Sequence, residues 1–208
     1  MARWFYAEKL KEEVSKQQLE TELSLLRSQV NPHFLFNTLN SIYSLTLTNN
    51  EKAPDAVMKL SRIMRYTLEE AQSEFVPLED ELAFINSYLE LQKIRVTDKV
   101  QVIYEVKGND GDTKIPPLLL IPFIENAFKY GVSARNKTSI KVIIVVENKQ
   151  LFFNCENDII PNISMQPGTG LGIANVRRRL ELLYKKNYTL NISTEEDKYK
   201  VVLRLEIG

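Results

Sequence analysis

The sequence predicts an α+β protein, with helices first and then a sheet that carries at least two helices. Residues 8–26 contain neither Gly nor Pro, which favours a long helix. Apolar and polar residues alternate from residue 100 onward and again over 199–207, which predicts strands. This change of pattern divides the chain at about residue 97 into a helical part, 1–96, and a sheet-containing part, 97–208.

The helical part begins with a predicted helix rich in Glu, Lys, Gln and Leu. A short heptad seam of the kind that pairs helices is formed by Leu19, Leu23, Leu26 and Val30. We therefore expect this region to dimerise. Proline removes a backbone donor and disfavours helix at the residue before it, so Asn31, which precedes Pro32, marks a kink or a fresh start. The helix then resumes to about Leu47.

Two further helices are predicted before the boundary. Residues 48–50 form a turn, after which an amphipathic helix ends near Ala71. Its apolar positions are Ala56, Leu60, Ile63, Met64 and Leu68. It makes an antiparallel hairpin with the helix before it. A third helix runs from about Leu78 to near Arg95, and residues 79–81 load its first turn with acidic charge that suits the helix dipole. Its seam is formed by Leu82, Ile85, Leu89 and Gln92.

The second part is predicted to alternate strands and helices. Strands are expected at 100–107, 140–146, 151–155, 189–193 and 199–207. The turn at Asn148 and Lys149 makes the second and third of these a hairpin. An apolar helix follows Pro116 and Pro117 and runs through Tyr130. A polar loop over 157–169 precedes a helix from about 171 to 184, whose inward residues are Val176, Leu180 and Leu183.

Composition excludes several classes of function. The 208 residues hold 27 basic and 27 acidic side chains, so the basic footprint of a nucleic-acid-binding protein is missing. Cys155 is the only cysteine, which excludes an internal disulfide and a Cys-rich zinc site and favours a reducing compartment. His33 is the only histidine, which excludes multi-histidine metal sites and any Ser-His-Asp triad without His33.

No signal peptide or membrane span is predicted. The longest apolar stretch, residues 115–124, is too short to cross a bilayer and is interrupted by prolines. Two interpretations of the first residues stay open. Arg3 followed by Trp4, Phe5 and Tyr6 is an arrangement common where a helix leaves a membrane, or these aromatic side chains pack on a neighbouring helix.

Three patches have the composition of a chemical site. The first is residues 31–40, NPHFLFNTLN, in which His33 follows a proline on a predicted helix. A neutral imidazole nitrogen is a nucleophile near pH 7, so His33 could accept a phosphoryl group. The alternative is a packed or capping histidine.

The second patch is ENAFKYG, residues 125–131, where polar residues interrupt an apolar helix. Asn126 offers a hard oxygen to a magnesium ion that bridges nucleotide phosphates, and Lys129 neutralises phosphate charge. The alternative is that Glu125 and Lys129 form only a solvated i,i+4 ion pair.

The third patch opens a helix and consists of Gly168, Thr169, Gly170, Leu171 and Gly172. Glycines let backbone N–H groups approach a phosphate, and the helix that follows presents its positive end. The string lacks the Lys-Ser/Thr of a P-loop and a βαβ context, which disfavours the familiar nucleotide-binding folds.

Together, in this order, the patches resemble LytS-type sensor histidine kinases, whose superfamily shares its ATP-binding fold with gyrase B, Hsp90 and MutL. Residues 31–40 are similar to the phosphoacceptor box and 125–127 to the N box. Residues 170–180, GLGIANVRRRL, resemble the second glycine box and its continuation. Residues 60–68 and 88–95 are similar to the helices between these motifs. The likeness runs from about residue 23 to the C-terminus.

The resemblance implies a helical dimerisation hairpin that bears the phosphoacceptor His33, followed by an α/β-sandwich domain of the GHKL type. It implies ATP and Mg²⁺ as cofactors, with Asn126 on the metal, Lys129 and the backbone of 168–172 on phosphates, and Asn157 on adenine. It also implies a homodimer that passes the phosphoryl group from His33 to an aspartate of a response regulator. Such a chain is a cytoplasmic fragment of a bacterial inner-membrane protein.

The chain departs from the family pattern at several positions. Asn157 stands where an aspartate usually accepts the adenine amino group, and no glycine follows it. An uncharged Asn accepts roughly half as strongly, which predicts a low ATP affinity. Tyr130-Gly131 replaces His-Gly, and Phe34 replaces the acidic neighbour that serves as base in commoner histidine kinases. Glu125 is then the candidate base.

Two other functions compete with a kinase. An ATPase or ATP-driven clamp of the same superfamily would have a similar ATP domain but no use for the helix that carries His33. A non-catalytic dimeric scaffold would follow if Asn157 abolished nucleotide binding.

Overall fold

The computed structural model describes residues 32–108, 113–160 and 171–207. All of them fall within one unit of the chain. The helix predicted over 8–26, the heptad seam from Leu19 to Val30, and Gly168, Thr169 and Gly170 lie outside the described residues. In the parts that the structure describes, no helix combines the length and apolar character that a bilayer crossing requires.

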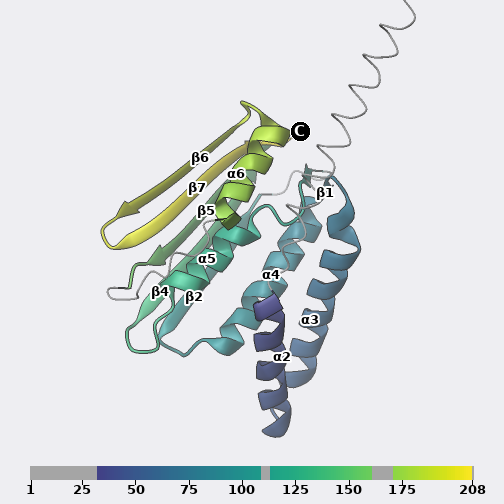
Figure 1. The fold of residues 1–208 in the computed structure, drawn as a ribbon, viewed down its shortest axis with the longest axis vertical. Helices are drawn as coiled ribbons and strands as arrows, with labels where there is room; N and C mark the ends of the chain where they lie inside the picture. The colour runs from purple at the N-terminus through teal and green to yellow at the C-terminus, as the bar shows by residue number, and fades with distance from the viewer. Residues whose placement is uncertain (1–31, 109–112, 161–170, 208) are drawn as a thin grey trace, which may run out of the picture. The chain divides into compact units, whose positions relative to one another are not determined.

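Among the described residues, three helices precede the sheet, as predicted (Figure 1). They are α2 (Pro32–Leu47), α3 (Ala53–Leu68) and α4 (Leu78–Arg95), with a short 3-10 turn, η1 (Glu70–Gln72), after α3. Proline at the first position of α2 suits a helix start, because that residue needs no intrahelical N–H donor. The α2–α3 turn contains Asn49 with a positive φ of 50°, a conformation that Asn tolerates better than most residues.

The apolar stripe of α3 differs in part from the prediction. Ala56, Leu60 and Ile63 are buried, but Met64 and Leu68 are exposed. The buried stripe continues to Tyr66 instead, whose ring stacks on Phe84 of α4 with centroids 4.8 Å apart. Because α4 covers only one side of α3, the residues next to that stripe remain on the outside.

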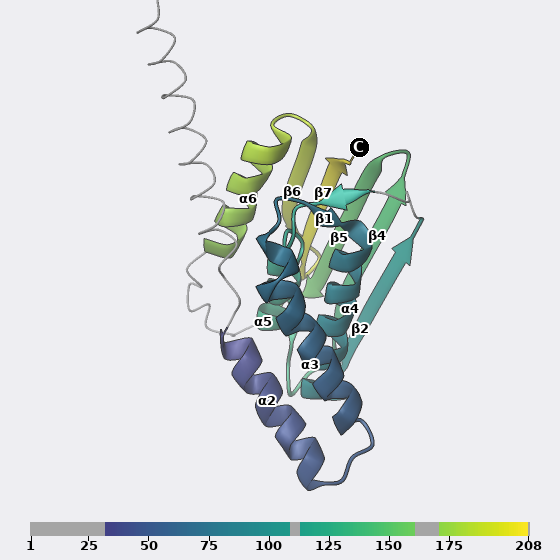
Figure 2. The same ribbon diagram turned by 90° about the vertical axis from the view of Figure 1, so that its right-hand side faces the viewer.

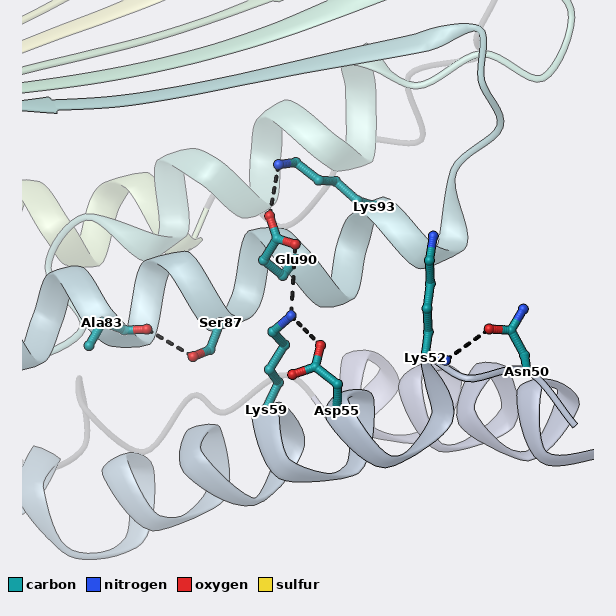
Figure 3. Close-up of polar contacts among 8 residues, drawn as sticks. All are labelled: Asn50, Lys52, Asp55, Lys59, Ala83, Ser87, Glu90 and Lys93. Atoms are coloured by element: carbon teal, nitrogen blue, oxygen red, sulfur yellow. Dashed lines mark hydrogen bonds and ion pairs between the residues drawn. The ribbon is translucent and has the colours of Figure 1, made fainter.

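Polar contacts also join α3 to α4 (Figure 3). Lys59 of α3 lies 2.5 Å from Asp55 and 3.8 Å from Glu90 of α4, and Glu90 in turn pairs with Lys93 at 2.8 Å. These groups keep part of their surface in water, so each pair contributes about 0.2–1 kcal/mol at most. The two helices are therefore held mainly by their apolar side chains.

The sheet has the strand order β2-β4-β5-β7-β6. Its strands are β2 (Val100–Lys107), β4 (Thr138–Glu147), β5 (Gln150–Asp158), β6 (Tyr188–Glu195) and β7 (Lys198–Glu206). β2 pairs in parallel with β4, and the other pairs are antiparallel. All five strands were predicted, but β5 extends through Asn157 and Asp158, which had been assigned to a loop. These residues pair with Tyr199 and Lys198 of β7.

A second, two-stranded sheet was not predicted. It pairs β1 (Val76–Pro77) with β3 (Lys114–Ile115) in antiparallel fashion. Strands of two residues are too short to show an alternating pattern, so sequence periodicity could not reveal them.

Two helices cover one face of the large sheet. They are α5 (Ile121–Gly131) and α6 (Leu171–Tyr184), and α2, α3 and α4 lie on the same side of the sheet (Figure 2). Alternate residues of the central strands point into this layer, for example Ile140, Phe153 and Leu203, which are all buried. α5 begins four residues after Pro117 rather than directly after it, and Leu118 between them has a positive φ of 57°.

Candidate functional site

The polar side of α5 brings three predicted site residues together. Glu125, Asn126 and Lys129 share a helix face with Pro122, since residues three, four and seven apart are neighbours on a helix. Glu125 and Asn126 are half-buried and Lys129 is exposed, whereas Phe123, Ile124 and Ala127 turn into the core. Lys129 Nζ lies 5.0 Å from the centroid of the Tyr130 ring, a cation–π contact at the exposed end of the face.

The start of α6 lies beside the start of this face. A Cβ built on Gly172 would stand 3.8 Å from Cβ of Pro122, which is ordinary van der Waals contact. The backbone that opens α6 therefore reaches the polar side of α5. Helix N-termini present unpaired N–H groups and a positive dipole end, which suit phosphate oxygens.

Asn157 lies beside Gly131, at the C-terminal end of α5. It is 2% exposed, and its Nδ2 donates to the carbonyl of Asp158 at 2.9 Å, so Oδ1 is the acceptor atom of the side chain. A Cβ on Gly131 would come within 2.6 Å of Cβ of Asn157, a distance that real contacts do not show. Glycine at 131 is thus what allows α5 to approach β5 so closely.

Asp158, the residue after Asn157, lies on the opposite face of the sheet. Neighbouring strand residues point to opposite faces, so Asp158 faces away from the helices that Asn157 faces. Its Oδ2 accepts from the backbone N–H of Ser139 at 2.6 Å and from the Ser139 hydroxyl at 3.1 Å. Asn157 is consequently the residue of this pair on the side of α5.

An aromatic chain connects α2 to α5 through α4. His33 is the second residue of α2, and Phe34, which follows it, is buried and stacks on Tyr88 with centroids 4.6 Å apart. Tyr88 in turn meets Phe128 of α5 edge-on, at 6.3 Å. Burying a Phe side chain contributes about 1.5–3 kcal/mol, so Phe34 fixes the start of α2 on α4. At the position where an acidic residue is usual in the commoner histidine kinases, this chain thus has Phe34, which packs on α4.

Electrostatics place Glu125 close to the same aromatic chain. Burial raises the pKa of Tyr88, and the negative charge of Glu125 raises it further. Gln92 Nε2 donates to the Tyr88 hydroxyl at 2.7 Å. Glu125 therefore raises the pKa of Tyr88, and the ring of Tyr88 stacks on Phe34, the residue after His33.

A buried polar network behind α5 was missed by sequence reasoning. Glu81 is fully buried, although as a first-turn acidic residue it was expected to serve the helix dipole. The Tyr66 hydroxyl donates to it, and so does the backbone N–H of Leu118 at 2.8 Å. Arg179 of α6 is 2% exposed and donates to the carbonyl of Pro117 at 2.8 Å. The only signal available was the position of Arg179 within the string at 170–180.

The residues present fit a nucleotide with magnesium. Mg²⁺ usually takes one or two protein oxygens and keeps several waters, which one half-buried Asn126 on an open helix face can provide. Among the described residues, no group of three or more His, Cys, Asp or Glu could hold a metal ion by itself. The assignment of individual residues to metal, phosphate and adenine stays a prediction.

Comparison with known proteins finds sensor histidine kinases. Residues 21–100 match the histidine kinase family. Sensor histidine kinase BtsS of Escherichia coli K12 is 33% identical over 188 residues, which cover 89% of this chain and 33% of BtsS. Sensor protein LytS of Streptococcus agalactiae serotype V is 29% identical over 208 residues, which cover 93% of this chain and 36% of LytS. The chain is thus similar to LytS-type sensor histidine kinases over most of its length.

The sequence resemblance to LytS-type kinases is therefore confirmed. The chain spans about a third of the length of the curated relatives that it matches. Among solved structures, the histidine kinase domain of the blue-light activated kinase EL346 from Erythrobacter litoralis is similar with a TM-score of 0.49 and 17% identity. That alignment covers 92% of this chain and 96% of the other.

Proposed function

We propose that this chain is the kinase core of a two-component sensor, which phosphorylates His33 with MgATP and passes the phosphoryl group to an aspartate of a response regulator. The observation that carries the proposal is that described residues of the predicted phosphate, adenine and phosphoacceptor patches lie next to α5 or are linked to it by packed side chains. Gly172 and Asn157 adjoin its two ends, and Phe128 links it through Tyr88 to the residue after His33. The similarity to sensor histidine kinases supports the same activity.

The roles follow from the chemistry of the side chains. Asn126 would hold Mg²⁺, Lys129 and the backbone of 168–172 the phosphates, and Oδ1 of Asn157 the adenine amino group. Bound MgATP would supply the γ-phosphoryl group, with the P–O bond between its β- and γ-phosphates breaking and ADP as the leaving group. His33 offers a neutral imidazole nitrogen as the nucleophile, and Glu125 is the residue of α5 suited to take up its proton. The N–P bond so formed is reactive enough for onward transfer to a carboxylate.

The kinase acts as a homodimer in this proposal. The outer face of α2 carries exposed apolar residues one turn apart, Phe36, Leu39, Tyr43 and Leu47. α3 adds Val57, Met58, Met64 and Leu68. Single exposed apolar residues are common on a surface, but a row on two adjacent helices marks an interaction site. A second copy that presents the same face would complete a four-helix bundle.

We also place this kinase core on the cytoplasmic side of a bacterial membrane, as part of a longer sensor. The support is that the matched relatives are named as sensor proteins and that the chain corresponds to about a third of each.

The test is labelling with γ-labelled ATP and Mg²⁺, beside the variants His33→Gln and Glu125→Gln. A phosphohistidine is acid-labile and alkali-stable, so we expect label of that kind on the wild type, none on His33→Gln and slower labelling of Glu125→Gln. ATP hydrolysis that persists in His33→Gln at the wild-type rate would instead indicate an ATPase. A folded wild type that binds no nucleotide would indicate a dimeric scaffold.

A further inference from the structure

The segment before α5 is held from two sides. Leu118 is buried and has a positive φ of 57°, a backbone conformation that L residues other than Asn and Asp rarely adopt. Its N–H donates to Oε2 of Glu81 at 2.8 Å, and its carbonyl oxygen lies 3.5 Å from Nη1 of Arg179. Nη2 of Arg179 donates to the neighbouring carbonyl of Pro117 at 2.8 Å. Glu81 of α4 and Arg179 of α6 are thus both hydrogen-bonded to the backbone of residues 117–118.

The Glu81 and Arg179 side chains are both buried, so losing one of their hydrogen bonds would cost stability. Glu81 has no exposed surface and Arg179 has 2%. Burying a charged group is costly unless it is hydrogen-bonded, and Oε2 of Glu81 and both Nη atoms of Arg179 have hydrogen-bond partners. The positive charge of Arg179 acts favourably on the Glu81 carboxylate. The Tyr66 hydroxyl of α3 donates to the same Glu81 oxygen and extends the network to a third helix.

Residues 117–118 lie just before α5, the helix of the candidate nucleotide site. Three residues separate Leu118 from Pro122, which lies beside Gly172 at the opening of α6. Asn126 and Lys129 follow Pro122 on the same helix face. Any shift of residues 117–118 along or around the helix axis would therefore move Asn126 relative to the backbone that opens α6.

We propose that Glu81 and Arg179 are positioning residues for the nucleotide site, which clamp residues 117–118 and thereby set α5 against the start of α6. The inference rests on the proposed kinase function. It adds that Glu81 and Arg179 support nucleotide binding without contacting the nucleotide themselves. It also gives α3 and α4 a physical connection to the ATP site, through Tyr66 and Glu81, that does not pass through His33.

The test compares Arg179→Met, Arg179→Lys and Arg178→Met in the full chain. Arg178 is exposed on the same helix and serves as the matched control. Three quantities are measured: the Kd of a fluorescent MgATP analogue, the labelling rate of His33 at saturating ATP, and hydrogen exchange of the amides of residues 117–131. For Arg179→Met we expect at least a tenfold weaker Kd, a saturated rate within about threefold of wild type, and faster exchange in 117–131. Arg179→Lys, which keeps one donor, should recover most of the affinity.

The outcomes separate the inference from the function. Unchanged affinity and unchanged exchange in a folded Arg179→Met protein overturn the clamp, as does an equal loss in Arg178→Met. If the wild type carries no label, the kinase function fails, and the exchange of 117–131 still decides whether Arg179 holds α5. Tyr66→Phe keeps the ring and removes one donor to Glu81. It should weaken the Kd several-fold in the same direction, and it replaces Arg179→Met if that variant does not fold.

Discussion

At the residue scale, the burial of Glu81 has a consequence for pH. Burial raises the pKa of Glu81 above its ordinary value of 4.5, against the hydrogen bonds from Tyr66 and Leu118 and the charge of Arg179. Burial also raises the pKa of Tyr104 of β2, and the charge of Glu81 raises it further. Between 4.5 and the raised pKa the folded chain holds a proton that the unfolded chain releases, so this group's contribution to stability falls as pH rises.

This sign predicts the behaviour of Glu81→Gln, which carries no titrating proton. The unfolding free energy of the wild type minus that of the variant should decrease as pH rises above 4.5, by up to about 1.4 kcal/mol per pH unit until the raised pKa is passed. Urea unfolding of both proteins at four pH values measures it. A difference that stays constant or grows with pH would show that Arg179 and the hydrogen bonds outweigh burial.

At the element scale, the outer face of α2 predicts the oligomeric state. Tyr43 is 63% exposed in the middle of the apolar row, so Tyr43→Glu places a charge where the second copy would pack. We expect the dimer dissociation constant to rise at least tenfold, measured by light scattering over a dilution series. Thr189→Glu on the edge strand β6 is the control and should remain dimeric. Equal dimerisation of both variants would contradict the assignment of this face.

The elements also show which parts of the fold a single sequence can predict. α2, α4 and the five long strands follow from local periodicity, which needs only neighbouring residues. The position of β7 between β5 and β6 does not, because it depends on pairing between distant segments. Glu81 was predicted only to suit the helix dipole, because its partners Tyr66 and Leu118 are 15 and 37 positions away. That Glu125, Asn126 and Lys129 lie on one helix was predictable, because they are close together in the sequence.

At the scale of the whole molecule, nucleotide binding should raise stability. A ligand at 100 times its Kd adds about 2.7 kcal/mol to the unfolding free energy when only the folded state binds it. For a chain of this size that shifts the Tm by about 5–10 °C. We expect this shift for the wild type with MgATP and little or none for Asn126→Ala, measured by thermal unfolding over a range of ATP concentrations. An equal shift in both would remove Asn126 from the site.

The strand order also has a consequence for how the chain is made. β7 lies between β5 and β6 in the sheet, yet it follows both in the chain. While the protein is synthesised, β5 therefore emerges with one edge unpaired and stays so until Lys198–Glu206 arrives. An open edge of this kind can pair with another chain. The late arrival of the fourth strand in the sheet order makes the nascent chain most prone to aggregation just before it is complete through residue 206.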